Sequence, residues 1–118
     1  MNKPEVWPLA RLIAYPFGKA AIWTLDFLRA TVTSMFPLRE IPEKGMPPTG
    51  LETLLAVGGG VLIDRAKHWR ATQSPMTKLF VIPSIWGSGA ENSRIAVLNE
   101  GDKKAIFVGG EYLPDVRS

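Results

Sequence analysis

The sequence predicts an α+β fold: an N-terminal helical arm of two helices, a proline-rich strap, and a small module with one helix and a three-stranded, mainly antiparallel sheet. Three observations lead to this prediction. Apolar residues recur at helical spacing early in the chain, prolines concentrate in residues 37–48, and the end of the chain holds short β-forming runs separated by glycines. We therefore expect a helical arm over 1–36, a linker over 37–49 and the α+β module over 50–118.

Composition limits the class of protein. The chain has 118 residues, 46% of them hydrophobic and 21% charged, as is typical of one globular domain. It has no cysteine, which excludes disulfides, thiol catalysis and Cys-ligated zinc. The net charge of +3 is a mild bias, because eleven acids are interspersed with fourteen bases. The opening MNKPEVWP lacks the apolar run of a signal peptide, so export by that route is not expected; the location stays open, with a virion or the cytoplasm as candidates.

The arm is predicted to contain two helices. Residues 8–15, PLARLIAY, suit a short helix with Pro8 in its first turn. Residues 19–36 suit a longer one, and its main apolar face gathers Ala21, Leu25, Leu28, Val32, Met35 and Phe36. A second apolar strip is formed by Trp23 and Phe27, one turn apart. A short chain has little material to cover both faces, so we expect Trp23 and Phe27 to contact a partner.

A membrane surface is the alternative partner for this arm. In that interpretation the helix lies in the interface, anchored by Trp7, Arg11, Tyr15, Lys19 and Trp23. A transmembrane span is disfavoured, because Asp26 and Arg29 would fall in the middle of the candidate segment. Packing of the aromatic strip in a protein core or interface is the preferred interpretation.

The stretch 49–70, TGLETLLAVGGGVLIDRAKHWR, is predicted to begin a helix. Thr49 and Glu52 have the spacing of a capping box, and leucines follow at helical intervals. The triple glycine 58–60 is expected to end that helix, since each glycine costs about 1 kcal/mol relative to alanine. Residues 61–69 fit either a helix or a strand.

The triple glycine could also belong to a binding motif. A phosphate loop would need Lys and Ser or Thr directly after the glycines, and a dinucleotide fingerprint would need the spacing G-x-G-x-x-G. Here the glycines run into VLID, so neither pattern is present. A close-packing membrane helix pair through Ala56 and Gly60 would need a longer apolar run. The glycines are therefore interpreted as a helix stop and a flexible corner.

A basic cluster with an embedded aromatic follows the glycines. Its candidate contacts for an anionic surface or nucleic acid are Arg65, Lys67, Trp69 and Arg70. His68 is the sole histidine, and the sequence offers no second ligand or nucleophile at a useful spacing. We expect no metal site, no catalytic residue and no cofactor, and His68 is interpreted as a surface residue.

The C-terminal module is predicted to be mostly β-structure. Residues 78–82, KLFVI, suit a strand, and residues 94–98 and 104–108 suit a hairpin around the turn NEGD. Residues 84–93 are predicted to form a loop that carries Trp86, and the tail carries Tyr112. These two aromatics complete the candidate partner-interface set.

These features favour a non-enzymatic structural or assembly subunit of a larger multichain complex, such as a virion component of a phage head, tail or connector. Its partners would be other protein chains in a homo- or hetero-oligomer, and no small-molecule substrate is evident. The alternative is a peripheral membrane or nucleic-acid binding module that uses the cluster from Arg65 to Arg70. An enzyme would require a constellation of distant residues that the sequence does not reveal. The sequence does not identify the partner or the stoichiometry.

Overall fold

Six parallel strands form one sheet in the computed structural model, which describes residues 4–83, 95–100, 103–108 and 114–117. The strand order is β1-β8-β5-β4-β2-β3. In chain order the strands are β1 (Glu5–Val6), β2 (Ala20–Thr24), β3 (Arg39–Ile41), β4 (Thr53–Gly58), β5 (Lys78–Pro83) and β8 (Val116–Arg117). An antiparallel hairpin of β6 (Ile95–Glu100) and β7 (Lys103–Val108) forms a second sheet.

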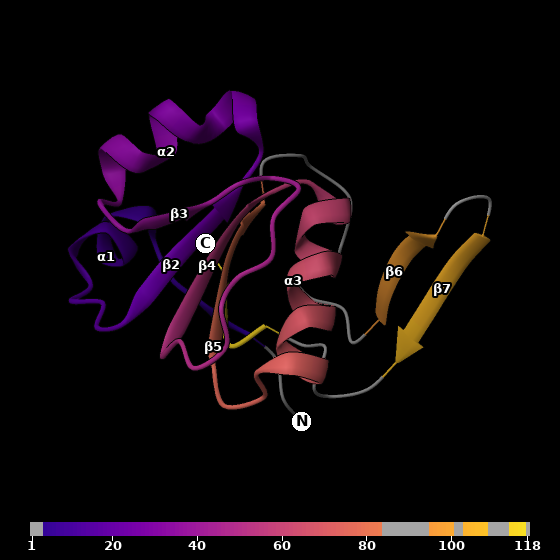
Figure 1. Ribbon diagram of the computed structural model, residues 1–118. Helices are drawn as coiled ribbons and strands as arrows, with labels where there is room; N and C mark the ends of the chain where they lie inside the picture. Colours follow the sequence, from indigo (N-terminus) through magenta and orange to yellow (C-terminus); the bar gives the residue numbers. More distant parts are fainter. Residues whose placement is uncertain (1–3, 84–94, 101–102, 109–113, 118) are drawn as a thin grey trace.

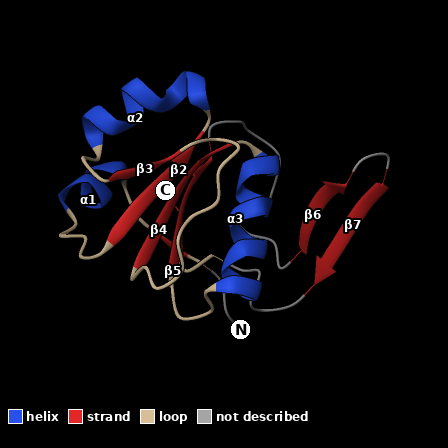
Figure 2. Ribbon diagram, in the orientation of Figure 1, coloured by secondary structure: helices blue, strands red, loops and turns tan. Residues whose placement is uncertain are grey.

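Helices cover both faces of the six-stranded sheet. The helical elements are α1 (Leu9–Ala14), the 3₁₀ turn η1 (Asp26–Leu28), α2 (Arg29–Met35) and α3 (Gly60–Gln73). The long helix α3 packs on one face, while α1 and α2 lie on the other (Figures 1 and 2). The hairpin lies beside α3, on the side away from the sheet. The molecule is therefore a layered α/β structure.

The core has two layers that alternate along each central strand. In β4, Leu54 and Ala56 belong to the cluster under α3, whereas Leu55 and Val57 belong to the cluster under α1 and α2. Every residue of β4 is buried. A parallel strand that is covered on both faces has no polar side, so its sequence shows a continuous apolar run instead of an alternating pattern.

The predicted fold class is wrong, and the main error lies in the supposed long helix over residues 19–36. Its first part is the parallel strand β2, next to β4, with Ala21, Ile22 and Trp23 buried. Only the second part is helical, as η1 and α2. The apolar residues of a buried strand followed by a helix imitate one helical stripe, because a run apolar at every position matches any period. Ala21 and Trp23, which that prediction assigned to two different helix faces, lie on the same side of β2, in the cluster under α3.

The predicted helix start at Thr49 is also wrong. The backbone N–H of Glu52 donates to the carbonyl of Lys19 at 2.8 Å, so this region joins the sheet through main-chain bonds. Gly50 has φ of 84°, a left-handed conformation that ends the preceding turn before β4 begins. The triple glycine consequently begins a helix, α3, instead of ending one. Residues 61–69, left open by the sequence, are helical.

Several local predictions are confirmed. The short helix over 8–15 appears as α1, the strand over 78–82 as β5, and the hairpin pairs Ile95 with Val108 and Glu100 with Lys103. The strap contains the short strand β3, which the sequence did not predict. The loop 84–93 lies outside the described residues. Strands from all three predicted ranges share one sheet, and the division into 1–36, 37–49 and 50–118 as folding units stays a prediction.

The helices in the described part of the chain are short. None of them is both long enough and apolar enough to cross a membrane.

Candidate functional site

The candidate site lies where strands β2 and β4 end side by side. β2 continues into η1 and α2 on one face of the sheet, and β4 continues into α3 on the opposite face (Figure 1). Two neighbouring parallel strands whose connections leave on opposite faces open a crevice at their carboxyl ends, and ligands of open α/β sheets bind in that crevice. The triple glycine forms one wall of this edge.

The start of α3 is built to accept an anion. Gly59 is the N-cap residue, with φ of −83° and ψ of −175°, and no side chain caps the helix. The first helical hydrogen bond runs from the N–H of Ile63 to the carbonyl of Gly59, at 3.1 Å. The earlier N–H groups of the first turn therefore point out of the helix end, and no acidic residue occupies that turn. Such an end carries a partial positive charge and suits phosphate.

Gly58 lets the helix begin directly against the sheet. A Cβ atom at this position would lie 2.8 Å from Cδ2 of Leu62 and 3.5 Å from Cγ of Leu25. A larger residue here would force the Leu62 side chain, and with it the packing at the start of α3, to shift. Glycine is needed here for close packing between the helix and the strand, which is one of the roles of glycine in dinucleotide-binding turns.

The opposite wall follows β2 and carries a carboxylate. The hydroxyl of Thr24 donates to the carbonyl of Val57 at 2.7 Å and so ties the ends of the two strands together. Beyond it, the N–H of Asp26 donates to Oε1 of Glu43 at 2.9 Å, and the N–H of Glu43 donates to Oδ1 of Asp26 at 3.3 Å. The Asp26 side chain remains 63% exposed. An exposed carboxylate, which also accepts a hydrogen bond from Nη1 of Arg29 at 3.4 Å, thus follows the end of β2.

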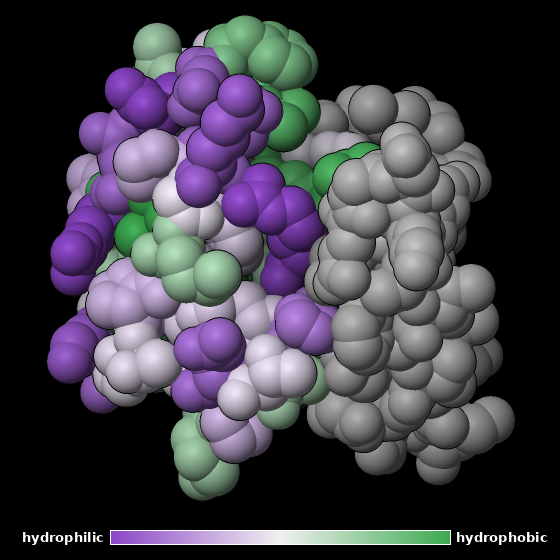
Figure 3. Space-filling model, turned by 45° about the vertical axis from the view of Figure 1, so that its right-hand side comes forward, coloured by the Kyte–Doolittle hydropathy of each residue, from purple (hydrophilic) through white to green (hydrophobic). Residues whose placement is uncertain are grey.

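Two large apolar side chains are exposed at the same edge. Phe27, in η1, is 80% exposed, and Val61, in the first turn of α3, is 62% exposed. In the space-filling view, hydrophobic residues gather at the upper end of the molecule, the end where β2 runs into α2 (Figure 3). The edge therefore offers both apolar surface and polar backbone groups.

The described structure places two of the four predicted interface aromatics, Trp23 and Phe27. Trp23 is 1% exposed in the core beneath α3, and its Nε1 donates to the carbonyls of Pro42 and Glu43. Phe27 is exposed at the carboxyl edge. Trp86 and Tyr112 lie outside the described residues.

The predicted basic cluster is mostly turned inward. Lys67 is completely buried, and its Nζ lies 3.5 Å from Oδ1 of Asp64. Arg70, 7% exposed, donates to Oδ2 of Asp115 at 2.7 Å. Trp69 is 2% exposed, and its indole N–H donates to the carbonyl of Pro47. The fourth member, Arg65, lies over the ring of Trp23, and its guanidinium donates to the carbonyls of Glu43 and Gly45. A role of the cluster at an anionic surface stays an untested prediction.

Several solved structures resemble this fold along almost the whole chain. An iron-containing alcohol dehydrogenase from Thermococcus thioreducens aligns over 96% of this chain and 43% of its own, with a TM-score of 0.73 and 21% identity. Maleylacetate reductase from Agrobacterium tumefaciens aligns over 99% of this chain and 41% of its own, with a TM-score of 0.75 and 16% identity. NADH-dependent butanol dehydrogenase A from Thermotoga maritima aligns over 99% of this chain and 42% of its own, with a TM-score of 0.71 and 15% identity.

The chain shares its fold with these oxidoreductases. It spans about two fifths of their length. No protein-family model matches the sequence, and no curated protein gives a significant match.

The likeness corrects the functional predictions. A non-enzymatic assembly subunit of a virion or another complex is contradicted, because the proteins that share this fold are enzymes. The same holds for the alternative of a membrane or nucleic-acid module. The expected partners, protein chains with no small-molecule substrate evident, are contradicted as well, because these enzymes are named for small alcohols and maleylacetate.

The residues that the structure describes do not fit an iron site. The described residues include no group of three or more His, Cys, Asp or Glu side chains that could hold a metal ion. The whole sequence has one histidine and no cysteine. No chemical step is therefore assigned to a metal here.

The sequence did not predict a binding site at the carboxyl edge, because its glycines match neither the phosphate-loop spacing nor the dinucleotide spacing. The informative signal was an apolar run, TLLAV, leading directly into glycines and then into a segment compatible with a helix. This is the strand–turn–helix context in which a glycine cluster binds phosphate.

Proposed function

We propose that this chain binds a dinucleotide cofactor of the NADH type at the carboxyl edge of β2 and β4, and that it is the nucleotide-binding part of an oxidoreductase acting on small alcohols or carbonyl compounds. The observation that carries the proposal is the triple glycine between β4 and α3, placed at the point where neighbouring strands turn to opposite faces. The shared fold with NADH-dependent butanol dehydrogenase supports it.

Each part of the edge has a task in this proposal. The uncapped N–H groups at the start of α3 bind the pyrophosphate, and Gly58 keeps that helix end close to the strands. The Asp26 carboxylate accepts a hydrogen bond from a ribose hydroxyl, as acidic residues near a strand end do in dinucleotide sites. The exposed ring of Phe27 offers a surface for a base.

The hydride chemistry would belong to the bound cofactor, which exchanges hydride with the substrate. The described residues of this chain bind and orient that cofactor. Groups that bind the substrate and move its proton would come from outside the described edge, because the chain corresponds to about two fifths of the similar enzymes.

A charge change at Gly59 tests the proposal with little risk to the fold. Aspartate and asparagine are both favoured at helix N-caps, so Gly59→Asp and Gly59→Asn should both keep α3 intact. The aspartate places a negative charge where the pyrophosphate binds, whereas asparagine has nearly the same shape without the charge. We expect NADH to bind Gly59→Asp at least about tenfold more weakly than Gly59→Asn, a difference of about 1.4 kcal/mol.

The affinities for NADH and ADP-ribose are measured by isothermal titration calorimetry with the 118-residue chain. Nicotinamide alone, which has no pyrophosphate, is the control ligand. Saturable binding of NADH and ADP-ribose that depends on the charge at position 59 supports the proposal. Equal affinities of the two variants, or no binding of NADH by the unmodified chain, would refute it.

A further inference from the structure

A reciprocal pair of hydrogen bonds joins the turn η1 to the segment 42–45, which leads from β3 toward β4. The backbone N–H of Asp26 donates to Oε1 of Glu43 at 2.9 Å, and the backbone N–H of Glu43 donates to Oδ1 of Asp26 at 3.3 Å. The two residues are 17 positions apart in the chain, so only the folded structure brings them together. Glu43 therefore restrains both the main chain and the side chain of Asp26.

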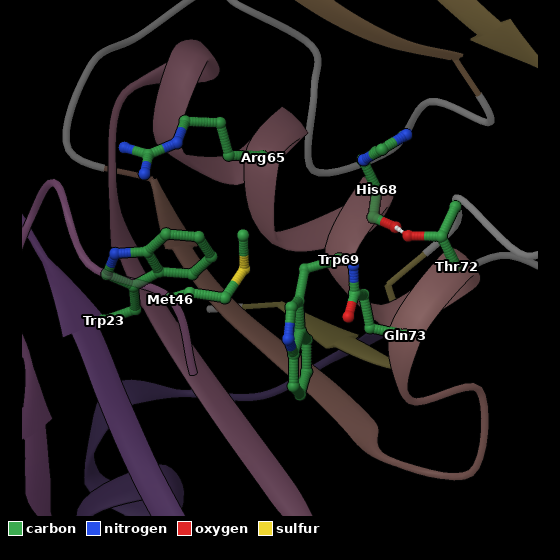
Figure 4. Close-up of a pocket in the computed structure, with 7 residues that line it drawn as sticks. All are labelled: Trp23, Met46, Arg65, His68, Trp69, Thr72 and Gln73. Carbon is green, nitrogen blue, oxygen red and sulfur yellow. Dashed lines mark hydrogen bonds between the residues drawn. The ribbon is translucent and has the colours of Figure 1, made fainter. Parts of the chain in front are cut away.

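Glu43 is itself held by a buried indole and by an arginine from α3. Its carbonyl accepts one hydrogen bond from Nη1 of Arg65 at 2.7 Å and another from Nε1 of Trp23 at 3.2 Å. Figure 4 shows the side chain of Arg65 beside the indole of Trp23, and the guanidinium lies 4.7 Å from the ring centroid. The main chain at Glu43 is thus tied to α3 and to β2 at once.

The hydrogen bonds to the Asp26 carboxylate all fall on one of its oxygens. Oδ1 accepts from the N–H of Glu43 at 3.3 Å and from Nη1 of Arg29 at 3.4 Å. No residue in the described part of the chain donates to Oδ2, and the side chain is 63% exposed. A carboxylate that is held at one oxygen keeps the lone pairs of the other for a ligand.

The bond from Arg29 is the weaker of these two restraints. The side chains of Arg29 and Asp26 are 45% and 63% exposed, and exposed ion pairs of this kind contribute little. Arg29 also pairs with Oε1 of Glu40 at 3.2 Å, so its guanidinium is shared between two carboxylates. The N–H of Glu43 belongs instead to a main chain that is already held, and it loses little freedom in bonding to Asp26.

We propose that Glu43 is a positioning residue of the cofactor site, which orients the Asp26 carboxylate so that Oδ2 meets a ribose hydroxyl of the cofactor. This inference rests on the proposed function, in which Asp26 contacts the ribose and the start of α3 binds the pyrophosphate. Glu43 does not touch the ligand. Its loss should therefore weaken recognition of the hydroxyl and leave binding of the pyrophosphate unchanged.

The test compares ADP with 2′-deoxy-ADP, which keeps the pyrophosphate and lacks one ribose hydroxyl. The dissociation constants of both nucleotides are measured by isothermal titration calorimetry with the 118-residue chain. We expect the unmodified chain to prefer ADP by at least about fivefold, because a site that bonds a hydroxyl rejects the analogue without it. Asp26→Ala should remove this preference.

Two substitutions at Glu43 separate its geometry from its charge. Glu43→Ala removes the acceptor for the Asp26 N–H and should lower the preference for ADP at least about threefold. Glu43→Gln keeps an oxygen acceptor at the same place and should retain the preference. Both variants remove the same charge, so their affinities for 2′-deoxy-ADP should agree within about twofold.

The matched control is Glu52→Ala, which removes an exposed carboxylate just before β4, at the opposite end of the strand from the glycine turn. It should retain the preference for ADP. Glu43 is half-buried and lies outside the helices and strands, so its substitutions are expected to keep the fold, which urea unfolding checks.

The outcomes separate this inference from the proposed function. A preference that is lost in Asp26→Ala but kept in Glu43→Ala would overturn the role of Glu43 and leave the cofactor site in place. Equal weakening of both nucleotides by Glu43→Ala, or the same loss of preference in Glu43→Gln, would also overturn it. If the unmodified chain bound neither nucleotide, the proposed function would fail and this inference with it.

Discussion

Asparagine in place of Asp64 tests whether the ion pair inside α3 is a strongly coupled buried pair. Lys67 is fully buried, the Asp64 side chain is 13% exposed, and their charged atoms are 3.5 Å apart. At this separation and an effective dielectric constant of about 20, the attraction is about 5 kcal/mol. Replacing Asp64 removes this attraction from a buried lysine, and breaking a buried pair typically costs about 3 to 5 kcal/mol. We therefore expect Asp64→Asn to lower the unfolding free energy by that amount and the midpoint temperature by roughly 10 to 20 °C.

The control is an ion pair of similar length at the surface. Arg29 and Glu40 are 3.2 Å apart, but their side chains are 45% and 47% exposed, so Glu40→Gln should cost about 1 kcal/mol or less. The unfolding free energies of both variants are measured by urea titration, with tryptophan fluorescence as the signal. The double variant Asp64→Asn with Lys67→Met should cost less than the sum of the single changes, because the attraction between the two side chains is then lost only once. A cost for Asp64→Asn no larger than that of Glu40→Gln would refute the reasoning.

Two further substitutions test the construction of the carboxyl edge. Gly58→Ala should lower the unfolding free energy by about 1 to 3 kcal/mol, because the new methyl group would lie 2.8 Å from Cδ2 of Leu62. Urea unfolding measures this change, and an unchanged midpoint concentration would contradict the prediction. Thr24→Val should cost about 1 to 3 kcal/mol, since it leaves the buried carbonyl of Val57 without the Thr24 hydroxyl. The matched control is Thr33→Val, because the Thr33 hydroxyl is exposed and bonds only within its own helix; this change should shift the unfolding midpoint little. Equal effects of Thr24→Val and Thr33→Val would count against the role of Thr24.

Local features were predictable where neighbours in the sequence are also neighbours in space. The hairpin of β6 and β7 has its turn residues and both strands within one short stretch, and α1 has Pro8 at its start and Pro16 beyond its end. The strand β5 is a short β-forming run that ends at Pro83. In each case the pattern that specifies the element lies within the element itself or just beside it.

The candidate site was less predictable, because its parts meet only after folding. Asp26 and Gly59 come from different βα units, and adjacent pairing of β2 with β4 brings them to one edge. Arg65 and Trp23 likewise meet only because α3 packs on the face of β2 that carries Trp23. The sequence marked the glycines and the aromatics as unusual but gave no sign of which would be adjacent.

The sequence by itself determined the apolar runs, the turn positions, the absence of cysteine and the local hairpin. Only the tertiary structure decided that residues 20–24 and 53–58 are parallel strands and that the glycines begin a helix. The physical reason is that a strand buried on both faces has no polar side, and the partners that cover it are distant in the chain. A segment such as TLLAV fits a buried helix and a buried strand equally well until its neighbours are in place.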